Sequence, residues 1–340
     1  MQATLTLDVN ALSHNLSCIK THYPKANVLA YLKQDAYGLG IEPIAMALSD
    51  AEGFGVTDLH SGLILRSMFA DKVIVHAAVA PDLAAIKAAL IQDITVVVYS
   101  EFMLDIIEKN RLKGQYWLKV NTGFNRLGVP VEKVDTLYKR LSKWSKTPLV
   151  LMTHFMDANP AYPSFQTQYN QWQSIICNYD TMISHASSNW LLNQIDPVGD
   201  WIRPGLMLYG QMSKQDWPLK PAIKLTAPVF QMQSIKKGDY IGYDHEHQFD
   251  HDTRVAIVAF GYGDGLSLAT KSLLSMDGQS FPIVGRVSMD FVAIEIGDYP
   301  LQVGDLVEIN LYDMYEAPKQ AALVAMNRRR LVTEVIKHAI

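Results

Sequence analysis

Lys33 is the residue whose setting in the sequence first suggests chemistry. It follows directly after the apolar run Val28–Leu32, which has the composition of a buried strand. Desolvation lowers the pKa of an ammonium group that is surrounded by apolar side chains. Such a lysine can act as the nucleophile that forms a Schiff base with a carbonyl compound. A lone lysine at the end of a strand is more often merely solvated, so its meaning depends on the elements around it.

Short runs of strand-forming residues alternate with helical patterns through the first two thirds of the chain. Apolar residues recur with helical spacing in the intervening stretches Pro43–Leu48, Asp82–Ile91, Glu101–Asn110 and Val131–Trp144. The eight expected strands are Val28–Leu32, Gly53–Thr57, Val73–Ala77, Ile94–Tyr99, Tyr116–Val120, Leu149–Thr153, Met182–His185 and Trp201–Ile202. Eight such units predict an α/β fold, a (β/α)8 TIM barrel, whose catalytic groups lie at the C-terminal ends of the strands, where Lys33 stands. An open doubly wound sheet is the alternative, but no G-x-G-x-x-G follows the first strand.

The pattern changes after about Ala222, where strand-like runs are separated by turns rich in Gly, Asp and Asn. The expected strands are Val229–Ile235, Tyr240–Tyr243, Thr253–Phe260, Phe281–Val284, Phe291–Ile296 and Leu306–Ile309. This is typical of a separate, mostly β domain, a small barrel or sandwich. We therefore expect the barrel over residues 1–222 and the β domain over 223–340, with the first few residues as alternative members of the β domain.

Composition narrows the classes of partner. The chain has 340 residues, 49% hydrophobic and 19% charged, with 30 basic and 34 acidic side chains and a net charge of −4. Without a block of like charge we expect no binding to nucleic acid or to a membrane surface, and a small molecule as ligand. The apolar runs are too short for a membrane span, and no secretory leader or metal-ligand spacing is evident. The only cysteines, Cys18 and Cys177, fit a reduced, cytoplasmic protein.

Five segments, in order along the chain, resemble the motifs of the alanine racemases. The first, Leu32-Lys33-Gln34-Asp35-Ala36-Tyr37-Gly38-Leu39-Gly40, is similar to the segment in which that family attaches pyridoxal 5′-phosphate. The other four are Lys119–Gly128, Arg203–Gly210, Gly261–Gly265 and Pro282–Asp290. Five motifs spread from residue 32 to residue 290 make a specific resemblance over most of the chain. It implies an isomerase that interconverts L-alanine and D-alanine, the latter for peptidoglycan of the cell wall.

The resemblance assigns the cofactor site. Lys33 would hold the cofactor through a Schiff base and serve as one acid/base. Tyr37 and Ser188 would bind the phosphate, and His154, Gly205 and Leu206 would be further cofactor-binding residues. Arg203 would donate to the pyridine nitrogen, and because a guanidinium stays protonated it cannot pass a proton to the ring. The cofactor would then be a weaker electron sink, which favours return of the proton to Cα.

The resemblance also assigns the second base and the substrate contacts. Tyr243 would be the second base, supplied by the other subunit of a homodimer with shared active sites. A free phenol has a pKa near 10, so Tyr243 would need a cationic network, for which His154 and Arg203 match the family residues. The substrate-binding residues would be Arg126, Tyr262, Met289 and Asp290. Lys119 matches a lysine that some family members carry in carbamylated form, and the sequence leaves its modification open.

Several positions depart from the family pattern, the first being Gln34 and Leu39, which replace the common Ala and His beside the lysine. The phosphate segment is His185-Ala186-Ser187-Ser188-Asn189, with Asn and Ser exchanged, so which of residues 187–189 binds phosphate is open. Leu268 stands where many members have an arginine. The segment Asn327–Thr333 lacks the tyrosine that closes the phosphate site and entrance in the family, which leaves open what replaces it.

The same residues are compatible with other functions. A racemase of another amino acid such as serine fits, since a small pocket rejects an added hydroxyl only by about 10²-fold. A decarboxylase with the same two domains usually pairs an acid with the pyridine nitrogen, which Arg203 does not match. A non-catalytic pyridoxal phosphate-binding protein would resemble the barrel alone, without the domain that carries Tyr243.

Overall fold

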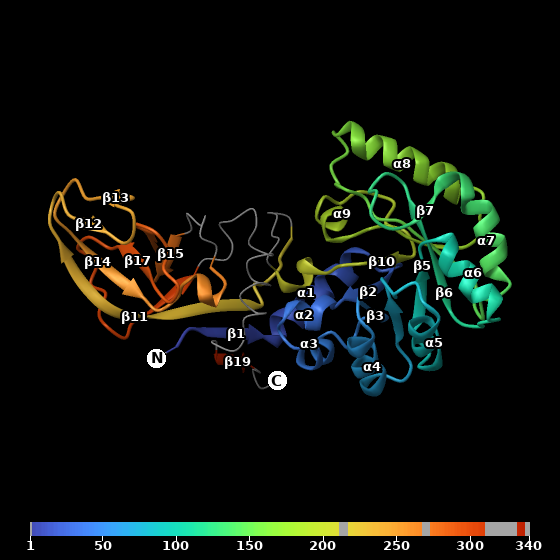
Figure 1. The fold of residues 1–340 in the computed structure, drawn as a ribbon, viewed down its shortest axis with the longest axis horizontal. Helices are drawn as coiled ribbons and strands as arrows, with labels where there is room; N and C mark the ends of the chain where they lie inside the picture. The colour runs from blue at the N-terminus through green and yellow to red at the C-terminus, as the bar shows by residue number, and fades with distance from the viewer. Residues whose placement is uncertain (1, 211–216, 267–272, 310–331, 337–340) are drawn as a thin grey trace. The chain divides into compact units, whose positions relative to one another are not determined.

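The computed structural model describes residues 2–210, 217–266, 273–309 and 332–336 (Figure 1). These residues fall into two compact units. The first, which we call the barrel unit, is Leu12–Ala36 with Gly40–Lys220. The second, the β unit, comprises the described parts of Met1–Ala11, Tyr37–Leu39 and Pro221–Ile340.

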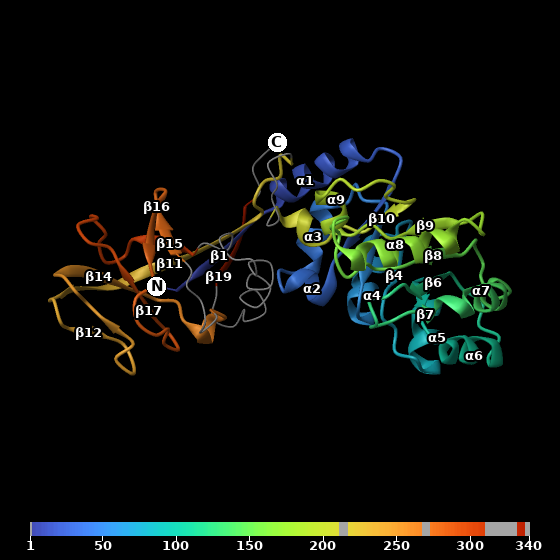
Figure 2. The ribbon, with the colours of Figure 1, turned by 90° about the horizontal axis from the view of Figure 1, so that it is seen from above.

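Parallel strands form a nearly closed barrel in the first unit (Figures 1 and 2). In spatial order they are β10 (Trp201–Ile202), β2 (Asn27–Tyr31), β3 (Gly53–Val56), β4 (Val73–His76), β5 (Thr95–Val98), β6 (Tyr116–Asn121), β8 (Val150–Met152) and β9 (Met182–Ser184). Each lies within or beside one of the eight expected runs, so the predicted barrel is confirmed. The short β7 (Val129–Pro130) pairs with β6. The two end strands are joined where Ile183 donates to the Asp200 carboxylate at 2.7 Å and Asp200 to the Ile183 carbonyl at 3.0 Å.

Helices cover the outside of these strands (Figure 2). They are α1 (Val9–His22), α3 (Ile41–Ala47), α4 (Leu59–Met68), α5 (Leu83–Ile91), α6 (Glu101–Lys109), α7 (Val134–Ser142), α8 (Pro163–Ile176) and α9 (Ser188–Leu192), with 3-10 turns η1 (Val131–Lys133) and η2 (Leu206–Tyr209). The short segment α2 (Lys33–Tyr37) follows β2 and is a left-handed turn rather than a regular helix. Asp58, Asp82 and Ser100 begin α4, α5 and α6 by accepting hydrogen bonds from backbone amides of the first turn, which stabilises each helix by about 1 kcal/mol. None of the described helices is long and apolar enough to cross a membrane.

Apolar side chains from alternate strand positions fill the inside of the barrel. The cluster consists of Leu29, Tyr31, Val75, Val97, Trp117, Val150, Met152 and Trp201. It is a packed core rather than a channel, so only the ends of the barrel can hold a ligand.

The β unit is built around one long strand, β11 (Ile223–Ile235), which Figure 1 shows along its full length. Its first residues pair with β1 (Thr4–Asp8) and then β18 (Leu306–Ile309), and the rest pairs with β14 (Thr253–Val258). The other elements are β12 (Tyr240–Ile241), β13 (His247–Gln248), η3 (Tyr262–Asp264), β15 (Leu273–Met276), β16 (Gln279–Pro282), β17 (Val292–Glu295) and β19 (Val332–Ile336). All these pairings are antiparallel except that of β1 with β19. The predicted mostly β domain is confirmed.

Candidate active site

Lys33 stands at the C-terminal end of β2 and starts an unusual turn. The four residues that follow, 34 to 37, have φ between 50° and 60°, the left-handed helical region, although none is glycine. Each costs about 1–2 kcal/mol. Asp35 closes the turn, because its carbonyl accepts from Gly40 at 3.1 Å and its carboxylate from Ile41 at 2.8 Å. Strain of this kind persists where the surroundings enforce it, most often at functional sites.

Two arginines from different parts of the barrel act on Lys33. Burial lowers its pKa first, and Arg126 and Arg203 lower it further. Burial also lowers the pKa of Lys119 to about 8, again with help from both arginines and from Lys33. The pKa of His154 falls to about 3 through burial and the same four cations. Among the described residues, none of the charged groups that act on these three side chains is a carboxylate, so the barrel mouth is suited to an anion.

Arg203 is the most firmly held of these cations. It is 5% exposed, and its guanidinium donates to Ser184 Oγ and the Thr153 carbonyl, both at 2.7 Å, and to the His185 carbonyl at 3.3 Å. A longer contact of 3.5 Å runs to His154 Nδ1. Because that nitrogen faces a donor, His154 is a neutral imidazole here, in agreement with its low pKa. The role of His154 and Arg203 as a network that supports Tyr243 stays a prediction.

Hydroxyl groups at the strand ends support this arrangement, and the sequence analysis missed them. Thr153 Oγ1 lies 2.9 Å from Thr122 Oγ1 and donates to the Val120 carbonyl at 2.9 Å. Ser184 Oγ, which accepts from Arg203, donates to the Trp201 carbonyl at 2.8 Å. The signal available in the sequence was a small hydroxyl residue at or just after the ends of three neighbouring strands.

Arg126 lies on the turn after β6. Its guanidinium is 4.3 Å from the centroid of the Phe124 ring, and that ring packs at 5.2 Å from His154. Gly128 permits the turn, with φ of 137° and a Cβ position only 2.5 Å from the Asn121 amide nitrogen. The exposed head of Arg126 is thus free to bind a ligand, while its stem is fixed beside the other cations.

Ser188, Gly205 and Leu206 form the donor set expected for phosphate. The Ser188 hydroxyl accepts from the Gly205 amide at 2.9 Å and from the Met207 amide at 3.4 Å. Leu206 is the first residue of η2 between them. Two backbone amides that converge on one hydroxyl can turn to a phosphate oxygen in its place, so these residues fit a phosphate group.

His185, in the same segment, has a structural role instead. Its ring nitrogens contact the Pro197 carbonyl at 2.8 Å and Trp172 Nε1 at 3.2 Å. Both are occupied, and burial lowers its pKa to about 4.

Tyr37, the other expected phosphate ligand, ends the left-handed turn with φ of 60°. By its contacts it belongs to the β unit, so its assignment to the phosphate stays a prediction. Leu268 and residues 327–331, where the chain departs from the family pattern, lie outside the described residues.

Tyr243 is on an exposed turn of the β unit, and 62% of its surface is exposed. Gly242, Asp244 and His245 on either side have positive φ. The carboxylate of Asp244 accepts from Arg286 Nη1. These contacts present the phenol to solvent in the single chain.

Tyr262, Met289 and Asp290 come from two segments of the β unit that pack backbone against backbone. The Tyr262 and Gly263 amides donate to the Ser288 and Met289 carbonyls at 3.0 and 2.9 Å. Tyr262 and Met289 are 40% and 52% exposed. The structure therefore groups these three predicted residues with one another within their unit.

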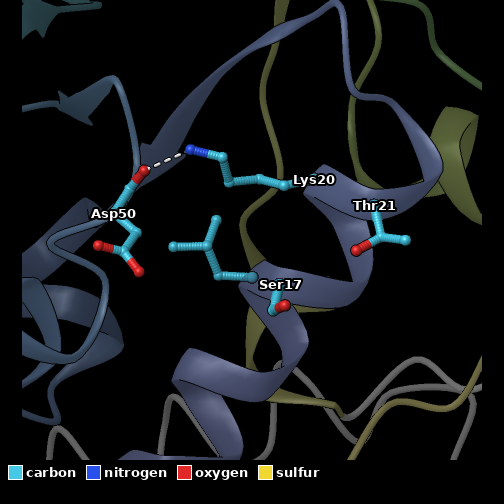
Figure 3. A pocket seen from close by; sticks show the side chains of 5 residues that line it. Ser17, Lys20, Thr21 and Asp50 are labelled. Carbon is cyan, nitrogen blue, oxygen red and sulfur yellow. Dashed lines mark hydrogen bonds between the residues drawn. The ribbon is translucent and has the colours of Figure 1, made fainter.

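A surface hollow elsewhere on the barrel unit is not part of this site (Figure 3). It has a volume of about 410 Å³ and is lined by Leu16, Ser17, Lys20, Thr21 and Asp50. Lys20 is occupied by the Asp50 carbonyl at 2.6 Å and by Glu52, whose other oxygen accepts from the Val28 amide. Val28 lies in the N-terminal half of β2. Residues at the N-terminal ends of barrel strands contribute to stability rather than to catalysis.

Comparisons with known proteins agree with these findings. A family model described as "Alanine racemase, N-terminal domain" matches residues 7–213, and "Alanine racemase, C-terminal domain" matches residues 222–337. The alanine racemase of Coxiella burnetii is 32% identical over 322 residues, 89% of this chain and 88% of that protein.

Solved structures show the same fold. The alanine racemase of Acinetobacter baumannii is 27% identical, with a TM-score of 0.90 over 98% of this chain and 99% of that chain. The alanine racemase of Bartonella henselae, described with covalently bound pyridoxal phosphate, has a TM-score of 0.87 at 24% identity, over 99% of this chain and all of that one.

Proposed function

Since the chain belongs to the alanine racemase family, we propose that it interconverts L-alanine and D-alanine with pyridoxal 5′-phosphate as cofactor, and so supplies D-alanine for peptidoglycan. The observation that carries the proposal is the barrel mouth. Lys33, a partly buried lysine with a lowered pKa, stands there among three further cations, Lys119, Arg126 and Arg203.

The barrel mouth has the groups that this cofactor needs. Lys33 offers an amine for the aldehyde, Ser188 with the Gly205 and Leu206 segment offers donors for the phosphate, and Arg203 offers a donor for the pyridine nitrogen. Tyr37 is the further phosphate ligand we propose. When bound, the cofactor supplies an electron sink for the Cα–H bond.

Arg203 limits how strong that electron sink becomes. Its bonds go to neutral oxygens of Ser184, Thr153 and His185, so its charge is not cancelled by a carboxylate partner. Burial lowers its pKa, but a guanidinium remains protonated near neutrality. A group that keeps its proton holds the pyridine nitrogen without protonating it, which favours return of a proton to Cα over side reactions.

Lys33 and Tyr243 are the two acid/base groups in this proposal. The lowered pKa of Lys33 increases its neutral fraction, so that it can accept the Cα proton of one enantiomer. Tyr243 would serve the other enantiomer from the opposite face. In one chain its phenol is exposed, and we propose that it completes the site of the other subunit in a homodimer.

Arg126 would bind the substrate carboxylate, with Tyr262, Met289 and Asp290 of the other subunit closing the site. Lys119 lies among cations that lower its pKa to about 8, so part of its amine is unprotonated near neutrality. An unprotonated amine reacts with CO₂, and the carbamate that forms would replace a repelling cation by an anion beside Arg126. This supports the carbamylated form without requiring it.

The function is tested by measuring the D-enantiomer formed from alanine, serine and lysine in a coupled assay. We expect alanine to have the largest kcat/KM. Borohydride should fix the cofactor onto Lys33, with loss of its visible absorbance and a mass increase on the peptide that contains residue 33. A protein that stays colourless with added pyridoxal phosphate, or racemises none of the three amino acids, contradicts the proposal.

A further inference from the structure

The ring of Tyr31 lies directly beside the amine of Lys33. Lys33 Nζ is 5.3 Å from the centroid of that ring, within the distance at which a cation is attracted to an aromatic face. Tyr31 is the last residue of β2 and is 6% exposed. Its ring belongs to the cluster that fills the barrel, so it forms part of the floor below the mouth.

Gly55 on the neighbouring strand makes room for this ring. Tyr31 and Gly55 are directly paired across β2 and β3. A Cβ on Gly55 would lie 2.6 to 2.9 Å from three atoms of the Tyr31 ring. The backbone of Gly55 is not in the left-handed region, so space for the ring, and not its conformation, explains the glycine.

The hydroxyl of Tyr31 does not explain why a tyrosine stands here. It is buried and has no hydrogen-bond partner among the described residues. A hydrogen bond within the barrel therefore does not hold the ring in place. The ring is held by packing in the barrel cluster and over Gly55, and its contacts with charge are the coupling to Arg203 and the approach of its face to Lys33.

The charges around Lys33 act in the opposite direction to its contact with the Tyr31 ring. Arg126 on the turn after β6 and Arg203 after β10 act on Lys33 directly. Lys119 on β6 and His154 after β8 are coupled to it as well. The cations among them all disfavour a proton on Lys33, whereas the negative face of an aromatic ring favours it.

We propose that Tyr31 is a positioning residue for Lys33, whose ring face holds the ammonium group at the barrel mouth and keeps it protonated to a higher pH than the surrounding cations alone would allow. The consequence for catalysis rests on the proposed function. When Lys33 accepts the proton from Cα, the ring stabilises the ammonium group that forms and keeps it near the place from which the proton returns.

The test separates the ring face from its size and from the hydroxyl. In the full chain, freed of bound aldehyde with hydroxylamine, the rate at which a small amine-reactive reagent labels Lys33 is followed against pH by peptide mass spectrometry. Position 31 carries Tyr, Phe (Tyr31→Phe), or phenylalanines with one, three and five ring fluorines introduced by nonsense suppression. Fluorine weakens the negative ring face with little change of shape.

We expect Tyr31→Phe to leave the labelling midpoint of Lys33 unchanged, because the ring remains. Successive fluorination should lower that midpoint in steps, by roughly half to one pH unit in all. The midpoints of the other lysine peptides should not move. If the pentafluoro variant does not fold, the one- and three-fluorine variants still give the slope.

Tyr116→Phe is the matched control. Tyr116 is a buried tyrosine on β6 whose hydroxyl donates to the Leu112 carbonyl at 3.0 Å, and its loss should leave Lys33 unchanged. A constant midpoint across the fluorinated series would show that Tyr31 only fills space and would overturn the proposal. A shift in Tyr31→Phe as large as in the pentafluoro variant would assign the effect to the hydroxyl and also overturn it. Labelling needs neither cofactor nor substrate, so its result is independent of whether the protein racemises alanine.

Discussion

The two units hold their candidate residues in opposite ways. In the barrel unit, Arg203 and Lys119 are 5% and 8% exposed, and hydrogen bonds to strand ends fix the guanidinium before any ligand arrives. In the β unit, Tyr243 and Met289 are 62% and 52% exposed. Preorganised charge costs stability but needs no rearrangement when the ligand binds. Exposed residues on turns contribute little to ligand binding until another surface covers them. The candidate residues of the β unit therefore do not form a complete site by themselves.

The largest expected effect tests whether one active site needs both a residue of the barrel unit and an exposed residue of the β unit. Lys33→Ala and Tyr243→Ala should each lower kcat by about 10³-fold or more, because each removes a positioned acid/base group. After the two proteins are mixed and exchange subunits, random pairing makes about half of the dimers mixed, and a quarter of all sites then have both groups.

Activity should therefore recover to about a quarter of the wild-type value. The measurement is racemisation before and after exchange, with two different tags to verify that mixed dimers form. Mixed dimers without recovered activity would place both groups in the same chain, and Tyr243 would then complete the site of its own barrel.

A smaller effect is expected on the free energy of unfolding, which the buried charge of Lys119 should lower. The pKa of Lys119 is about 8 in the folded chain, against 10.5 for a free lysine side chain. Between these values the unfolded chain binds more protons, so the free energy of unfolding should rise with pH from about 8 to 10.5. Below pH 8 the full cost is present, at most about 3 kcal/mol.

Lys119→Met removes that charge at similar length. We expect it to stabilise the protein at pH 7 by about 1–3 kcal/mol and to flatten the rise between pH 8 and 10.5, as measured by urea unfolding in carbonate-free buffer. The exposed Lys25 is the control, and Lys25→Met should change neither quantity. A destabilised Lys119→Met would mean that the ammonium group has a favourable partner.

The smallest effect is expected on the turn that carries Tyr243. Asp244 and Arg286 form an ion pair whose side chains are 63% and 45% exposed. Such pairs contribute less than about 1 kcal/mol, so Asp244→Asn should leave the urea midpoint of the protein almost unchanged. A loss above about 2 kcal/mol would instead show that another surface buries this pair.

The sequence allowed the barrel strands to be predicted because each is a short, continuous apolar run flanked by turn residues, as in Val73–His76 and Thr95–Val98. Strand β15 (Leu273–Met276) is as long as these two strands, but it was missed because Ser275 interrupts its apolar run after two leucines. The left-handed turn after Lys33 was not predictable, since Gln34, Ala36 and Tyr37 belong to residue types that rarely adopt positive φ. Asp35 closes this turn through hydrogen bonds from the nearby Gly40 and Ile41 amides.

Within the site, residues that belong to sequence motifs could be named in advance, as Lys33 and Arg203 were. Supporting residues could not, because their roles arise only from the closure of the barrel. Ser184 and Thr153 meet Arg203 across strands that are far apart in sequence. Tyr31 looks like any core aromatic until the paired Gly55 and the amine of Lys33 are seen beside it.

The cations at the barrel mouth also make the stability of the fold depend on the concentration of an anionic ligand. Their mutual repulsion is relieved by any anion that binds them, and a ligand that binds only the folded chain stabilises it by mass action. At a concentration 100 times its Kd, such a ligand adds about 2.7 kcal/mol to the free energy of unfolding. A cell that runs short of this ligand would then hold less of the protein as well as less of its activity, because the unliganded chain unfolds more often and is degraded faster.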